Sequence, residues 1–106
     1  MTDRQRNILV GDAKNNNDRD SFVSDWALSS IWGDDADISK AAEQCGKIWD
    51  AVHKPMGEIR ASMGLTQAQM AERLCVPKRT LENWEYKGTC PVYVRILIAR
   101  VWMGLE

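Results

Sequence analysis

The stretch LTQAQMAERLCVPKRTLENWE, Leu65–Glu85, predicts two short helices joined by a tight turn. Thr66 and Gln69 have the spacing of a capping box, in which the side chain of each residue bonds the backbone N–H of the other. The first helix therefore begins at Gln67. It ends after about two turns at Cys75–Pro77, because proline is accepted at the start of a helix but not in its interior.

The second helix of this stretch has an apolar side and a polar side. Leu81 and Trp84 are three residues apart and share the buried side. The exposed side carries mostly basic, amide and hydroxyl groups: Lys78, Arg79, Thr80, Glu82, Asn83 and Tyr86. In the major groove of DNA, arginine or lysine can donate to guanine, and asparagine can pair with adenine. With the small Ala71 where they cross, the two helices have the arrangement of a helix-turn-helix.

The same residues resemble the Cro/CI-type helix-turn-helix family, also called the xenobiotic-response-element or lambda-repressor-like family. The resemblance covers about residues 56–103, roughly half of the chain, and implies a C-terminal bundle of about five helices. It also implies that Gln67 contacts a DNA phosphate and braces the second helix, which faces bases or backbone. The residues expected to contact DNA are Gln67, Lys78, Arg79, Thr80, Glu82, Asn83, Tyr86 and Lys87.

The stretch departs from the family pattern at two positions. Cys75 stands where the turn usually has glycine, so we expect a residue with a Cβ atom to adopt a positive φ at a cost of about 1 kcal/mol. Glu82 places a carboxylate on the side that faces DNA. A carboxylate there repels phosphates unless it accepts from cytosine N4 or pairs with a neighbouring arginine, Arg79 or Arg73.

The last predicted helix, residues 92–103, is apolar on nearly every side. Its apolar surface exceeds what one side of a small bundle buries, which indicates a further packing partner. Two arrangements explain the surplus and both can hold: a homodimer, or cover by N-terminal helices of the same chain. The residues expected in this packing are Val94, Leu97, Ile98, Val101 and Trp102.

The remaining sequence divides the chain into three segments. Residues 1–20 are polar apart from Ile8–Val10 and predict a flexible arm, with a short strand as the alternative. Residues 21–54 predict an acidic helical segment. Residues 55–106 form the helix-turn-helix domain, in which a helix opened by Pro55 precedes the quoted stretch.

Two amphipathic helices are predicted in residues 21–54. The first runs over Phe22–Ile31, and the second over Ile38–Val52, where apolar residues recur at spacings of four and three after the N-cap Asp37. Five tryptophans among eight aromatic residues indicate a compact core, expected around Trp26, Trp49, Trp84 and Trp102. The expected fold is all-α, a small bundle with two N-terminal helices before a five-helix-type helix-turn-helix.

Composition narrows the classes of protein that fit. With 106 residues the chain holds one small domain, and it contains no apolar run of membrane-spanning length and no signal-like start, so we expect a cytoplasmic protein. Its three cysteines match neither a disulfide framework nor a metal knuckle, and its single histidine, His53, has no second ligand at metal spacing. We therefore expect reduced thiols, no metal, no cofactor and no enzymatic activity.

A net charge of −1 hides two opposite halves. Residues 1–53 hold six basic and ten acidic residues, a net charge of −4. Residues 54–106 hold eight basic and five acidic residues, a net charge of +3. This asymmetry fits a basic DNA-binding face beside an acidic partner segment, and solvated helix faces would also produce it. The acidic residues that such a segment would offer are Asp34, Asp35, Asp37, Glu43 and Asp50.

The expected function is a sequence-specific transcriptional regulator, a repressor of the phage or mobile-element type. It would bind a double-stranded operator as a homodimer through the helix at residues 77–86. The alternative is a helix-turn-helix protein that binds and inhibits a protein target, similar to antitoxins or anti-CRISPR inhibitors, with or without autorepression.

Overall fold

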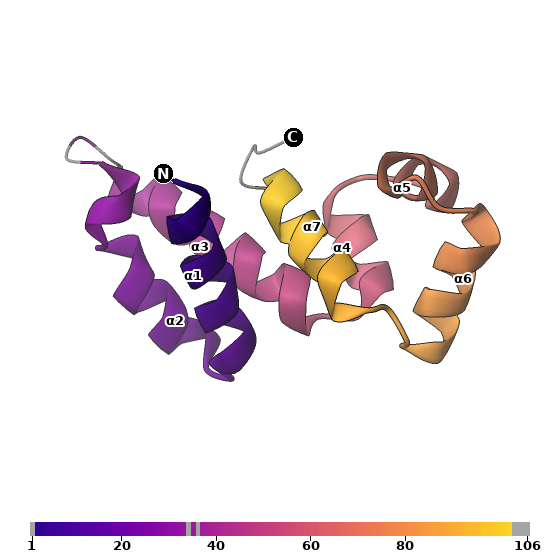
Figure 1. Cartoon of the computed structure of the whole chain (residues 1–106), viewed down its shortest axis with the longest axis horizontal. Coiled ribbons are helices and arrows are strands. Elements are labelled where there is room, and N and C mark those ends of the chain that lie inside the picture. The colour runs from indigo at the N-terminus through magenta and orange to yellow at the C-terminus, as the bar shows by residue number, and fades with distance from the viewer. Residues whose placement is uncertain (1, 34, 36, 103–106) are drawn as a thin grey trace.

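The computed structural model describes residues 2–33, 35 and 37–102, with side chains described as far as Arg100. Across these residues the chain is entirely helical and has no strand, which confirms the expected all-α fold (Figure 1). The elements are α1 (Asp3–Asn15), α2 (Arg19–Ala27), the short 3-10 helix η1 (Ser30–Trp32), α3 (Ile38–His53), α4 (Met56–Ser62), α5 (Gln67–Leu74), α6 (Lys78–Lys87) and α7 (Val92–Trp102). No helix among them is long and apolar enough to cross a membrane.

The predicted flexible arm at residues 1–20 is wrong, because α1 occupies most of it. A capping box opens this helix: Gln5 N donates to Thr2 Oγ1 at 3.1 Å and Thr2 N donates to Gln5 Oε1 at 2.8 Å. Leu9 and Val10, part of the apolar run that allowed a strand as the alternative, are buried on one side of the helix. This short apolar face is sufficient to stabilise α1 as a helix, because α3 packs against it.

The two helices predicted in residues 21–54 are present with altered details. α2 ends at Ala27, before the predicted Ile31, and η1 follows it. α3 begins after Asp37, whose carboxylate accepts from the backbone N–H groups of the first turn as predicted. The buried side chains of α3 lie partly off the predicted stripe, at Ala41, Cys45, Ile48 and Ala51, because α2, α1 and α7 cover different sides of this helix.

Aromatic side chains fasten α1 to its neighbours. The indole N–H of Trp49 donates to the carbonyl of Asn16 at 2.8 Å, and Nε2 of His53 donates to the carbonyl of Ala13 at 2.6 Å. The rings of Trp49 and His53 stack with centroids 4.0 Å apart. His53 thus has a structural role at the end of α3 and satisfies carbonyl groups that the end of α1 leaves open.

A single core connects both halves of the chain. Its largest fully buried side chains are Phe22, Leu9, Ile48, Ile59, Met70, Leu81 and Ile98. Trp26, Trp49 and Trp84 were expected at the centre of the core, and they lie partly buried against its edge; the side chain of Trp102 is outside the described residues. Because the cluster of contacts runs from α1 to α7, the chain builds one core.

The last helix is covered largely from within the chain. α7 packs against α3 and α1, and Val94 and Ile98 are buried there, as expected for cover by N-terminal helices. Leu97 remains 49% exposed, and the side chains of Val101 and Trp102 lie outside the described residues. α3 packs against both α4 and α7, so it supplies the fifth helix of the expected C-terminal bundle, and three helices precede α4 where two were predicted.

Candidate nucleic-acid interface

The turn between α5 and α6 has the predicted strained residue. Cys75 adopts a left-handed conformation with φ 56° and ψ 39°. Its N–H donates to the carbonyl of Glu72 at 3.1 Å, and the N–H of Val76 donates to the carbonyl of Ala71 at 3.0 Å. These two bonds form a Schellman cap, a conformation for which glycine is the usual residue. The cap ends α5 and turns the chain towards α6.

The inner faces of α5 and α6 fix how the two helices cross. Met70 and Ala71 on α5 and Leu81 on α6 are buried, and Trp84 packs partly buried beside them. The small Ala71 allows the close approach that the sequence predicts. The opposite side of α6 is consequently directed to solvent.

The outer side of α6 collects the predicted DNA-contacting side chains. Those exposed to solvent are Lys78, Arg79, Glu82, Asn83, Tyr86 and Lys87. Thr80 differs from the expectation, because it is half-buried one turn before Trp84. Arg79 and Asn83 are four residues apart on α6, so they share one face of the helix.

Glu82 finds a partner other than the predicted arginines. Its Oε1 lies 3.6 Å from Nζ of Lys78, one turn earlier on α6. Both side chains are about half exposed, so this ion pair is weak and leaves both groups accessible. Within the described part of the chain, no carboxylate lies within ion-pair distance of Arg79.

A half-buried polar network behind α6 was not predicted from the sequence. Nη2 of Arg60 on α4 lies 2.9 Å from Oε1 of Glu85, and Nε of Arg60 donates to the same oxygen at 3.0 Å. Nε2 of Gln67, the first residue of α5, donates to Oε2 of Glu85 at 3.2 Å. Arg60 also donates to the carbonyl of Leu65 at 3.1 Å. Two helices, α4 and α5, are thereby tied to the inner side of α6, and Gln67 makes the bracing contact that the resemblance implies.

Gly57 makes room for this network. A Cβ atom at this position would lie 3.1 Å from Oε1 of Glu85, closer than nearly all Cβ contacts. A side chain at residue 57 would press on the carboxylate that Arg60 holds. The sequence does not predict that Arg60, Glu85 and Gly57 meet, because these residues lie on different helices and no local spacing relates them.

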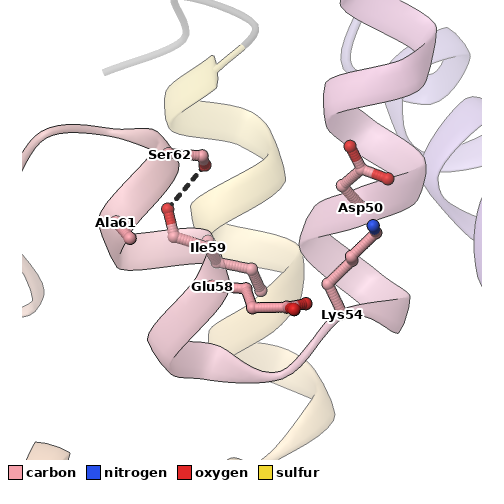
Figure 2. Close-up of a pocket in the computed structure, with 6 residues that line it drawn as sticks. All are labelled: Asp50, Lys54, Glu58, Ile59, Ala61 and Ser62. Atoms are coloured by element: carbon pink, nitrogen blue, oxygen red, sulfur yellow. Dashed lines mark hydrogen bonds between the residues drawn. The ribbon is translucent and has the colours of Figure 1, made fainter.

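The remaining chemistry-bearing groups lie away from α6. A pocket of about 300 Å³ opens between α3 and α4 and is lined by Asp50, Lys54, Glu58, Ile59, Ala61 and Ser62 (Figure 2). None of the predicted DNA-contacting residues lines it. Burial raises the pKa of the Cys45 thiol to about 11, which keeps it protonated, as expected for a structural cysteine. In the described residues no cluster of three metal-ligating side chains occurs.

The α4–α6 region matches one family model. Residues 56–91 match the family model described as Helix-turn-helix. These residues contain the turn at Cys75, the outer side of α6 and the Arg60–Glu85–Gln67 network. A search of curated proteins and a search of solved structures returned no match.

Proposed function

We propose that this chain is a sequence-specific transcriptional regulator that inserts α6 into the major groove of its operator, because residues 56–91 match the family model described as Helix-turn-helix and resemble the Cro/CI type. The observation that carries the proposal is the pair Arg79 and Asn83, exposed on one face of α6. Arginine recognises guanine through two donors, and asparagine recognises adenine through a donor and an acceptor. The Arg60–Glu85–Gln67 network holds α6 at a fixed angle to α5 behind this face.

Each further residue of the interface has a defined role. Lys78, Lys87 and Gln67 contact phosphates and fix the register of the protein on the duplex. Glu82 releases Lys78 and accepts from the amino group of a cytosine. Thr80 and Tyr86 contact the sugar-phosphate backbone at the edges of the groove.

A homodimer completes this function. α7 leaves Tyr93 68% exposed and Leu97 49% exposed, four residues apart on one side of the helix next to the helix-turn-helix. An isologous contact through this side pairs two copies on a palindromic operator with half-sites about one helical turn apart. The resemblance favours a repressor of the phage or mobile-element type, acting in the cytoplasm.

Fluorescence anisotropy tests the DNA-binding proposal. The protein is titrated into the duplex upstream of its own gene and into a scrambled duplex, at two salt concentrations. We expect a preference for the first duplex of the order of 10³ and a steep loss of affinity with salt. Arg79→Ala with Asn83→Ala should abolish the preference and leave the free energy of unfolding within about 0.5 kcal/mol.

The matched control changes the same residue types elsewhere. Arg4 and Asn17 are exposed near the ends of α1, so Arg4→Ala with Asn17→Ala should keep the preference for the native duplex. Equal and weak binding of the wild-type protein to both duplexes would refute the proposal.

A second candidate function is inhibition of a protein target through the N-terminal segment. It is favoured by exposed carboxylates at Asp35, Asp37 and Glu43, on a part of the chain outside the family match. A correctly folded protein that does not bind DNA would support this candidate. Proteins that act in this way include antitoxins and anti-CRISPR inhibitors, with or without autorepression.

A further inference from the structure

Two large apolar side chains are exposed at the end of the molecule farthest from α6. Leu28, which directly follows α2, is 72% exposed, and Ile38, the first residue of α3, is 58% exposed. The end of α2, η1 and the start of α3 lie together at the left end of Figure 1, whereas α6 lies at the right end of the long axis. Leu28 and Ile38 thus flank η1 along the chain, and exposed apolar side chains on neighbouring elements favour a docking surface.

A pocket lies between η1 and the first two turns of α3. It measures about 140 Å³ and is lined by Trp32, Asp37, Lys40, Ala41 and Gln44. The indole N–H of Trp32 is already bonded to the carbonyl of Trp26 at 2.8 Å, so the ring offers apolar surface to a ligand. Since a cavity of about 150 Å³ accepts a benzene ring, this pocket has room for one leucine or phenylalanine side chain.

The segment that carries the exposed apolar groups is acidic. The described residues from 25 to 44 include the exposed carboxylates Asp25, Asp35, Asp37 and Glu43 against a single ammonium group, Lys40. Oε1 of Glu43 lies 3.4 Å from Nζ of Lys47, one turn later on α3, so this ion pair offsets part of the negative charge. The surface is therefore complementary to an apolar segment that carries lysine or arginine.

A second copy of this chain suits the surface poorly. Two copies joined end to end here would place their α6 helices at opposite ends of an assembly about twice 43 Å long. Adjacent operator half-sites are only about 34–36 Å apart. The like charges of two acidic ends would also face each other across such an interface.

We propose that the surface formed by Leu28, Trp32, Ile38 and the adjoining pocket docks a segment of a partner protein. The segment carries one large apolar side chain that enters the pocket, and flanking lysine or arginine residues that meet Asp35 and Asp37. Because this surface lies at the opposite end from α6, docking leaves the DNA-reading face free. The exclusion of a second copy rests in part on the proposed operator binding, whereas the test of the docking surface uses no DNA.

Selection from a phage-displayed library of random short peptides identifies what the surface binds. Peptides are selected on the wild-type protein after removal of those that bind Leu28→Lys/Ile38→Lys. We expect the enriched peptides to contain a large apolar residue flanked by lysine or arginine. An enriched peptide is then synthesised, and its affinity is measured by anisotropy for the wild type, for Ile38→Lys and for the control Ile8→Lys.

Ile8 is a matched control because it is 52% exposed on α1, outside the proposed surface. Ile38→Lys should weaken peptide binding by about tenfold or more, and Ile8→Lys by less than about twofold, with both melting temperatures close to that of the wild type. Higher salt should weaken binding to the wild type. Failure to enrich discriminating peptides, enrichment of acidic or neutral peptides, or equal effects of the two variants would overturn the proposal, whatever the outcome of the DNA titrations.

Discussion

Replacing Glu85 with glutamine is expected to destabilise the protein far more than its place on a surface helix indicates. The substitution keeps the shape of the side chain and removes the charge that Arg60 and Gln67 hold. Breaking one side of a buried ion pair costs about 3–5 kcal/mol, whereas an exposed pair contributes about 0–1 kcal/mol. With the Arg60 side chain 24% exposed and the Glu85 side chain 12% exposed, the pair lies between these limits, closer to the buried one.

We therefore expect the free energy of unfolding to fall by about 2–3 kcal/mol, a loss of roughly 8–20 °C in melting temperature. Urea denaturation of the wild type, Glu85→Gln, Arg60→Met and the double variant, followed by circular dichroism, measures this cost and the coupling between the two residues. The coupling energy should reach about 1.5 kcal/mol or more.

Glu82→Gln is the matched control for this experiment. Glu82 lies on the same helix and pairs with Lys78 at 3.6 Å, but both side chains are about half exposed. Its replacement should change the free energy of unfolding by less than about 0.5 kcal/mol. If Glu85→Gln costs no more than Glu82→Gln, or the coupling to Arg60 is near zero, the network does not hold α6 and the reasoning fails.

Three further predictions concern single positions. Cys75→Gly should raise the free energy of unfolding by about 0.5–1 kcal/mol, because glycine adopts the left-handed conformation without steric cost; a lower melting temperature would contradict this. Trp84→Ala should lower the free energy of unfolding by about 3 kcal/mol, since the indole packs between α6 and the core, and an unchanged melting temperature would show that it does not. Native Cys45, with its pKa raised to about 11, keeps a proton that the unfolded chain loses near pH 9. The free energy of unfolding of the wild type should consequently fall from pH 9 to 11 more steeply than that of Cys45→Ala, and parallel pH profiles would disprove this role.

The features that the sequence predicted correctly are those with local causes. The capping box at Thr66 and the positive φ of Cys75 each depend on residues within one or two turns. α1 was missed although Thr2 and Gln5 have the same capping-box spacing as Thr66 and Gln69. Its polar composition masked a signal that was present, and the surface that covers it lies on α3.

The features that were missed depend on how distant helices cross. Arg60, Gln67 and Glu85 come from three helices and meet only because α4 and α5 approach the inner side of α6. The covering of Val94 and Ile98 by α3 and α1 could be stated as an alternative, but periodicity alone did not decide between it and a dimer.

The position of α3 has a consequence for how the chain unfolds. This helix contacts α1, α2, α4 and α7, so it belongs to both halves of the molecule. Residues 56–91 are the part that resembles other proteins, yet the core beneath them continues through Ile48 into Leu9. We therefore expect that residues 56–91 do not fold on their own and that melting is a single cooperative transition. A ligand that binds only the folded chain at either end should raise the melting temperature of the whole molecule.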